Sequence, residues 1–251
     1  MRKCLTVRPD AAPALTQKEA RGFDELRCGD EFCQEKAGDL AGLRALKSRF
    51  PDKDLVLVTP LLTGPSLAGV QATARGMLRE KLCSRLVVND LGLLSLLAAG
   101  RKSGVKISVG RVLLSNLGGS IGSRLFKSLL AKARVQSFEV DSLEGLAQVA
   151  DYPGVPCDLH APYAYLTHTR HCPFSGGFPS GCGRPCGETV YPLRSGNEGT
   201  VFLKGNAYFR DNGADARALL KKYPGRIRSL VFPLGRTPAR GPLPEDDQHA
   251  G

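Results

Sequence analysis

The sequence predicts a TIM-like (β/α) barrel, closed or nearly closed and incomplete or irregular in its repeat. Predicted strands and helices alternate about six times, which is the order of parallel strands joined by covering helices. The strands are short apolar runs, as expected for strands buried on both faces. A chain of 251 residues, 42% of them hydrophobic, suits one large domain of this kind. We therefore expect one barrel domain over residues 1–235 and a disordered tail over 236–251, which is rich in Pro, Gly and acidic residues.

The clearest strand is Leu55–Thr59 (LVLVT), a continuous apolar run that Pro60 closes. A doubly wound nucleotide-binding sheet fits less well, because Gly118–Gly122 has the wrong spacing for a dinucleotide fingerprint and does not directly follow a strand. The segment Thr200–Phe209 is expected to be extended. The other predicted strands are Leu5–Arg8, Phe23–Cys28, Arg85–Asn89, Lys106–Gly110, Ser137–Asp141, Pro156–Ala161 and Ile227–Leu234.

Helices are predicted between these strands. Apolar residues recur at helical spacing at Leu40, Leu43, Leu46 and Phe50, and Pro51 ends this helix. The remaining predicted helices are Leu15–Gly22, Ser66–Leu82, Leu91–Lys102, Ile121–Arg134, Leu143–Ala150 and Ala214–Tyr223.

The net charge of +11 suits an anionic partner, such as nucleic acid, an anionic lipid face or an anionic small substrate, or simply a solvated basic surface. The N-terminus has no apolar signal region, and the longest apolar run, Leu91–Ala99, is far short of the ~20 residues of a membrane span. We therefore expect a cytoplasmic protein without a membrane span. In that compartment, its eight cysteines are expected to be metal ligands or buried thiols rather than disulfides.

The stretch Arg170–Cys186 (RHCPFSGGFPSGCGRPC) is the most distinctive part of the chain. It holds Cys172, Cys182 and Cys186, with four glycines and three prolines among them, so it is a loop rather than a helix interior or a central strand. Free cysteines usually lie in cores as small apolar residues. Three of them on one loop indicate thiolates that converge on a metal centre.

A fourth ligand is needed, and Cys33 is the best candidate because it follows an early strand and can reach the same end of the barrel. The residues alone leave three interpretations of these thiols open. They bind an iron–sulfur cluster, they bind zinc with or without His171, or they bind nothing. Cys28 is expected inside a strand. The cysteines expected to be core thiols are Cys4, Cys83 and Cys157.

Polar residues also follow several predicted strands, where barrel enzymes carry their chemistry. Asn89 and Asp90 form either a substrate-contacting pair or, for Asp90, the N-cap of the next helix. Arg111 and Arg170 either hold an anionic substrate by bidentate contacts or are surface charges.

Two histidines, His160 and His168, flank Tyr163 and Tyr165, and we interpret them as structural. The sequence shows neither a nucleophile elbow nor an HExxH motif, which argues against the corresponding hydrolases and zinc proteases.

Several motifs follow one another in a characteristic order. They are GDEFC (Gly29–Cys33), LVLVTP (Leu55–Pro60), VVNDLG (Val87–Gly92), SVGRVLLSN (Ser108–Asn116), FEVD (Phe138–Asp141), PYAYLTHTRHC (Pro162–Cys172), then Cys182 and Cys186, and KGNAYF (Lys204–Phe209). In this order, over roughly residues 20–235, the chain resembles the collagenase-like peptidase family. Its members include the anaerobic ubiquinone-hydroxylation proteins UbiU and UbiV, and relatives that act in tRNA and ribosomal RNA hydroxylation.

The resemblance implies a TIM-like barrel with a [4Fe–4S] cluster on Cys33, Cys172, Cys182 and Cys186. It also implies oxygen-independent hydroxylation, with prephenate proposed as the oxygen source for some members. Despite the family label, peptidase activity is not expected. The residues expected to line the substrate side are Asn89, Asp90, Arg111, Tyr165, Arg170 and Asn206.

Two departures from the family pattern bear on the substrate. The loop between Cys172 and Cys182 is short, and the residues after Cys33 lack the basic pair common in the ubiquinone branch. The length of the chain favours a short UbiV-like subunit that pairs with a longer homologous partner. The substrate is then a quinone precursor, another anionic small molecule or, given the positive charge, RNA. A zinc- or cluster-stabilised binding module without turnover is the alternative.

Overall fold

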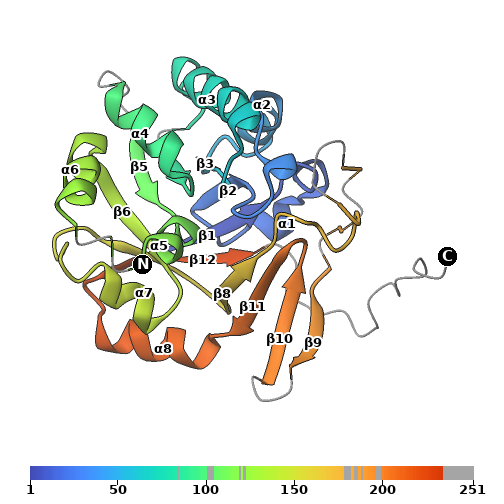
Figure 1. Ribbon diagram of the computed structural model, residues 1–251. Coiled ribbons are helices and arrows are strands. Elements are labelled where there is room, and N and C mark those ends of the chain that lie inside the picture. Colours follow the sequence, from blue (N-terminus) through green and yellow to red (C-terminus); the bar gives the residue numbers. More distant parts are fainter. Residues whose placement is uncertain are drawn as a thin grey trace.

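The computed structural model describes residues 1–83, 85–100, 105–118, 120, 123–177, 182–183, 186–187, 189–195 and 199–233 (Figure 1). Parallel strands form a closed barrel in the order β1-β12-β7-β6-β5-β4-β3-β2, with helices between them, which confirms the predicted TIM-like fold. The predicted tail, 236–251, lies outside the described residues. The barrel strands are β1 (Arg2–Val7), β2 (Glu25–Gly29), β3 (Asp54–Val58), β4 (Arg85–Val88), β5 (Lys106–Val109), β6 (Val135–Val140), β7 (Cys157–His160) and β12 (Ile227–Pro233).

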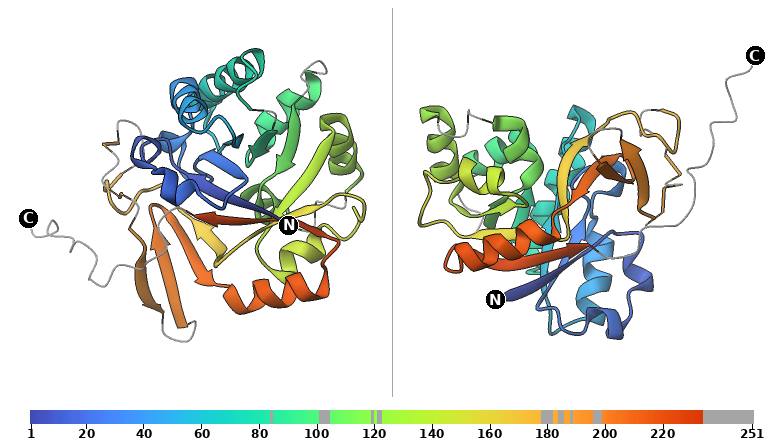
Figure 2. Two further views of the ribbon diagram at one scale, coloured as in Figure 1. Left: turned by 180° about the vertical axis from the view of Figure 1, so that it is seen from behind. Right: turned by 90° about the horizontal axis from the view of Figure 1, so that it is seen from below.

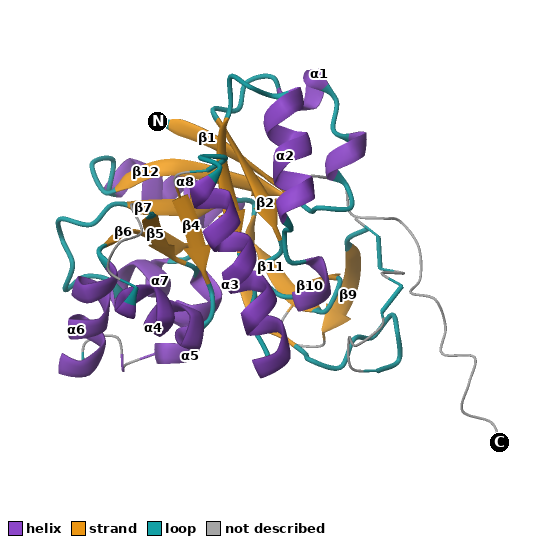
Figure 3. Ribbon diagram, turned by 90° about the horizontal axis from the view of Figure 1, so that it is seen from above, coloured by secondary structure: helices purple, strands orange, loops and turns teal. Residues whose placement is uncertain are grey.

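The helices surround the barrel strands (Figure 3). Several begin where a side chain caps the first turn: Asp39, Asp90, Ser123 and Ser142 each accept a hydrogen bond from the backbone three residues later. None of the described helices is long and apolar enough to cross a membrane. They are η1 (Ala12–Ala14), α1 (Gln17–Ala20), η2 (Gln34–Lys36), α2 (Leu40–Arg49), α3 (Gly64–Arg79), α4 (Leu91–Ala99), α5 (Arg111–Leu117), α6 (Arg124–Ala133), α7 (Leu143–Gln148) and α8 (Gly213–Lys222).

Two helices differ most from the prediction. The helix expected over Leu15–Gly22 is the short α1, because Thr16 is its N-cap and Gly22 turns the chain at φ +85°. Helix α5 was not predicted. The ends expected at 101–102 and 121–122 lie outside the described residues.

A second sheet interrupts the repeat between β7 and β12. It is antiparallel, in the order β8-β11-β10-β9, and lies beside the barrel (Figures 1 and 2). The segment expected to be extended is a hairpin of two strands, whose turn uses Gly205 at φ +59°. This insertion places a second wall beside one end of the barrel. Its strands are β8 (Tyr163–His168), β9 (Tyr191–Ser195), β10 (Gly199–Lys204) and β11 (Ala207–Asp211).

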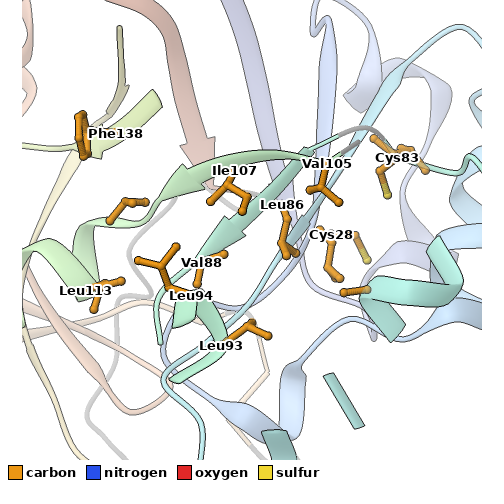
Figure 4. Packing of buried hydrophobic residues seen from close by; sticks show 14 of the residues in the cluster. Cys28, Cys83, Leu86, Val88, Leu93, Leu94, Val105, Ile107, Leu113 and Phe138 are labelled. Atoms are coloured by element: carbon orange, nitrogen blue, oxygen red, sulfur yellow. The ribbon is translucent and has the colours of Figure 1, made fainter. Parts of the chain in front are cut away.

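The apolar core lies between the barrel and its helices. Leu86, Val88 and Ile107 on the strands pack in one cluster with Leu93 and Leu113 on the helices (Figure 4). The same cluster includes Cys28, Cys83 and Cys157, and Cys4, outside this cluster, is fully buried on the first strand. The prediction that these are core thiols is confirmed.

The inside of the barrel is charged rather than apolar. Arg27 is fully buried, and its guanidinium donates to Glu25 (2.8 Å), Asp158 (3.1 Å) and Glu139. Arg85 donates to Asp158 (2.7 Å) and to Glu25. Since side chains alternate between the two faces of a strand, the charged residues point inward while their apolar neighbours face the helices. The expectation of purely apolar strands is therefore wrong for β2, β6 and β7.

Candidate functional site

A cavity of about 80 Å³ opens at the carboxyl end of the barrel strands. Its walls come from residues that follow β1, β2 and β5, from the end of β7, and from the β10–β11 turn, which is where barrel enzymes carry their sites. The lining includes Arg8, Glu31, Phe32, Lys36, Arg111, His160, Tyr163, Lys204, Gly205 and Phe209.

Arg111 is the predicted site residue that lies in this cavity. Its guanidinium donates to Glu31 (Nη2 to Oε2, 2.8 Å), to Asp141 (3.1 Å) and to the carbonyl of Tyr163 (2.9 Å). The rings of Phe32 and Phe209 lie 5.6 Å from its central carbon, within cation–π range. Although burial opposes the charge, Glu31 and Asp141 raise the pKa of Arg111, so the residue is a fixed cation in the wall of the cavity.

His160 lies on the floor of the same cavity, at the end of β7. Its Nε2 is 2.8 Å from Oε2 of Glu139, and its Nδ1 is 4.0 Å from Oε2 of Glu31. Burial, reinforced by Arg111, lowers the pKa of His160 to about 3, so the ring is neutral at pH 7. The sequence analysis interpreted His160 as structural, whereas the structure places it among the cavity-lining residues.

The two cysteine-bearing segments meet at this end of the barrel. Lys36, three residues after Cys33, is buried and its Nζ lies 2.6 Å from Sγ of Cys186. Asn206 joins the segments as well, because its Nδ2 donates to the carbonyls of Phe32 (3.1 Å) and Thr169 (2.6 Å). Residues some 150 positions apart are thus held beside one cavity.

The four predicted ligands differ in burial. Cys172 and Cys186 are buried, whereas Cys33 and Cys182 are half-buried. Burial raises the pKa of the Cys33 thiol to about 11. The backbone of Cys172 is fixed by a hydrogen bond to the carbonyl of Gly177 (2.8 Å). Residues 178–181 and 184–185 of the loop lie outside the described residues.

The spacing of these thiols bears on which metal they suit. Around one tetrahedral zinc, Zn–S bonds of ~2.3 Å place sulfurs about 3.8 Å apart. Within the described residues, which include all four cysteines, one set of three potential metal ligands has its donor atoms within 4.8 Å of one another. That set is Glu31, Glu139 and His160, and it includes no cysteine. Among the described residues, no three of these thiols have their sulfurs all within 4.8 Å of one another. A cluster with one thiolate on each iron accepts wider spacing, and an all-cysteine donor set is the one such clusters use.

Tyr165 and Arg170 do not line the cavity. The ring of Tyr165 stacks on Phe32 with centroids 5.3 Å apart, and its hydroxyl lies 2.6 Å from Nδ1 of His168. Burial raises the pKa of Tyr165 to about 12. Arg170 is exposed at the start of the cysteine loop. Tyr165 thus supports Phe32, which does face the cavity.

Asn89 and Asp90 are also outside the cavity lining. Asn89 is fully buried and links neighbouring segments, donating to the carbonyl of Thr59 (2.9 Å) and accepting from the backbone of Val112 (3.2 Å). Asp90 accepts from the backbone of Leu93 (2.8 Å) and is the N-cap of α4, so that interpretation is confirmed. Both side chains hold loops at the barrel end.

No protein-family model and no curated protein matches the sequence. Solved structures with a similar fold include a glycoside hydrolase family 18 N-acetylglucosaminidase from Paenibacillus barengoltzii, 11% identical over 92% of this chain and 94% of that chain, with a TM-score of 0.46. Human YKL-39, described as a pseudo-chitinase with retained chitooligosaccharide binding properties, is 9% identical over 92% of both chains (TM-score 0.43). A mandelate racemase/muconate lactonizing enzyme from Roseiflexus sp. is 17% identical over 64% of this chain and 47% of that chain (TM-score 0.42). These likenesses concern the barrel fold alone.

Proposed function

We propose that this protein is an iron–sulfur protein of the collagenase-like peptidase type, acting in oxygen-independent hydroxylation. Cys33, Cys172, Cys182 and Cys186 hold a [4Fe–4S] cluster, and the neighbouring cavity binds the small molecule to be modified. The chain works with a longer homologous subunit, as in quinone biosynthesis. The proposal does not include peptidase activity.

The observation that carries the proposal is the contact between Lys36 and Cys186. The ammonium nitrogen of Lys36 lies 2.6 Å from the buried sulfur of Cys186. This contact joins the Cys33 segment to the Cys172–Cys186 loop, so ligands distant in sequence lie on one side of one cavity.

The residues of the cavity define what it can do. The rings of Phe32, Tyr163 and Phe209 supply an apolar wall, and Lys36 and Arg111 supply positive charge, which suits a cyclic or aromatic anion. When bound, the cluster supplies electron transfer or polarises the substrate. Asn206 ties the segment before Cys33 to the segment before the cysteine loop, because its Nδ2 donates to the carbonyls of Phe32 and Thr169.

The net charge of +11 favours a second candidate, in which the hydroxylated substrate is tRNA or ribosomal RNA. Retention on RNA that weakens steeply as salt rises would support this candidate, and no retention at low salt would remove it. A zinc- or cluster-stabilised module without turnover is a third candidate, for which metal binding without any modified product is the signature.

The cluster is tested by replacing Cys182 with alanine in protein purified without oxygen. We expect Cys182→Ala to lose most of its iron and its broad visible absorbance, because a cysteine-ligated cluster is destabilised when a ligand is removed. Cys83→Ala is the matched control, since Cys83 is buried in the apolar core (Figure 4), and it should keep its iron. Iron content and absorbance that are the same in both variants would contradict the assignment.

A further inference from the structure

The charges inside the barrel form a network of ion pairs that ends beside the cavity. Deeper in the barrel, three carboxylates form ion pairs with three guanidiniums. The carboxylates are those of Glu25, Glu139 and Asp158, and the guanidiniums are those of Arg27, Arg85 and Arg228. Beside the cavity, Glu31 and Asp141 both form ion pairs with Arg111. His160 joins the two parts and is neutral. The two carboxylates beside the cavity therefore share one guanidinium, while Arg8, Lys36 and Lys204 also line the cavity.

The orientation of His160 supplies a ligand at this place. Its Nε2 is directed at Glu139, whose other carboxylate oxygen is held by Arg27, so a proton on Nε2 is donated to Glu139. Nδ1 then carries the lone pair. Within the described residues Nδ1 has no hydrogen-bond partner, and its closest ion-pair contact is Glu31 at 4.0 Å. A histidine that is 94% buried thus presents an unused nitrogen to the cavity.

The geometry of the three side chains resembles that of a metal centre. Donor atoms of Glu31, Glu139 and His160 all lie within 4.8 Å of one another. Two donors bound to one ion at ~2.0–2.2 Å lie about 3–3.6 Å apart, so His160 and Glu31 need to approach by roughly half an ångström. A metal-bound histidine almost always donates its other ring N–H to a carboxylate, which is the role that Glu139 has here.

We propose that a divalent metal ion binds on the cavity floor, coordinated by His160 Nδ1 and Glu31 and positioned through Glu139. The ion binds beside Glu31 and leaves its remaining coordination positions open to the cavity. One nitrogen and one carboxylate ligand suit a first-row ion such as Mn²⁺, Fe²⁺ or Zn²⁺. This site is separate from the four cysteines and does not depend on the proposed cluster.

The experiment is a titration of the full-length protein with Mn²⁺, purified without oxygen, in which electron paramagnetic resonance measures the free ion. Mn²⁺ is the probe because soft thiolates select other metals, so the cysteines compete little for it. We expect one ion per chain. Glu31→Gln and His160→Gln should each weaken binding at least ~10-fold, and Glu139→Gln by ~10- to 100-fold as a residue that positions the ligand.

Two control variants separate this site from its surroundings. Asp141→Asn removes one of the two carboxylates that pair with Arg111 but removes no metal ligand. Its loss of affinity for Mn²⁺ should therefore be smaller than that of Glu31→Gln. Cys182→Ala should bind Mn²⁺ like the unaltered protein, even where it has lost its iron. The site proposal is therefore tested independently of the cluster.

A measurement on the unaltered protein guards against variants that do not fold. Bound Mn²⁺ should broaden the nuclear magnetic resonance signals of one of the four histidine rings, His160, before the others. No binding at millimolar Mn²⁺ overturns the proposal. Binding that is equally strong in Glu31→Gln and His160→Gln, or that first broadens another histidine, also overturns it.

Discussion

Replacing Arg27 with methionine is expected to lower the free energy of unfolding by ~3–5 kcal/mol, the largest effect of any single exchange inside the barrel. Methionine fills much of the space but leaves three buried carboxylates, those of Glu25, Glu139 and Asp158, without the cation that contacts all of them. A domain is typically stable by only ~5–15 kcal/mol, so the loss is a large fraction of the total. Urea unfolding at pH 7, followed by circular dichroism, measures it.

The matched control for Arg27→Met is Arg44→Met. Arg44 makes a two-bonded ion pair with Glu80, but its side chain is 55% exposed, so its loss should cost much less than the loss of Arg27. The deficit of Arg27→Met should also shrink as the pH falls, because protonation removes the uncompensated charge from Glu139, whose pKa burial already raises. Equal costs for the two variants would show that the buried network does not hold the barrel together.

Gly29→Ala is expected to destabilise the protein by at least about 3 kcal/mol and to lower its iron content. A Cβ on Gly29 would lie 2.1 Å from the carbonyl oxygen of Val58, its partner on β3, and the backbone is at φ +134°. Strand β2 would have to move away from β3. Because Glu31 and Cys33 follow directly, the cavity and the cysteine site would move with it. Urea unfolding and iron analysis check the two effects.

Gly22→Ala is the control that separates the cost of the Cβ contact at Gly29 from the cost of a positive φ angle. Gly22 also has a positive φ, +85°, but nothing lies within 4 Å of the position of its Cβ. Its replacement should cost about 1 kcal/mol and leave the iron content unchanged. If the two glycine variants lose the same stability, the close approach of β2 to β3 is not what requires Gly29.

The barrel itself was predictable because most of its strands are short, largely apolar runs bounded by turns, and most of them are followed by a helical pattern. Its charged interior was not predicted. The signal was present in pairs spaced by two along three strands, Glu25/Arg27, Glu139/Asp141 and Asp158/His160. That spacing puts both members on one face of a strand. The apolar residues between them dominated the interpretation and hid the alternation.

The candidate site was predictable only in part. Cys33 and Arg111 follow barrel strands as expected, because strand ends can be located from the sequence. Asn89 follows a strand as well, yet its side chain links backbone segments, and local sequence does not distinguish the two roles. The position of Lys36 against Cys186 depends on the inserted sheet and the cysteine loop. Contacts between segments this far apart carry no local pattern.

Metal and acid-labile sulfide analysis, together with a visible spectrum, on protein purified without oxygen tests the central claim most directly. The account predicts about four irons and four sulfides per chain, with the broad visible absorbance of a cysteine-ligated [4Fe–4S] cluster. One zinc per chain without colour or sulfide would contradict it, and the cysteines would then form a structural metal site.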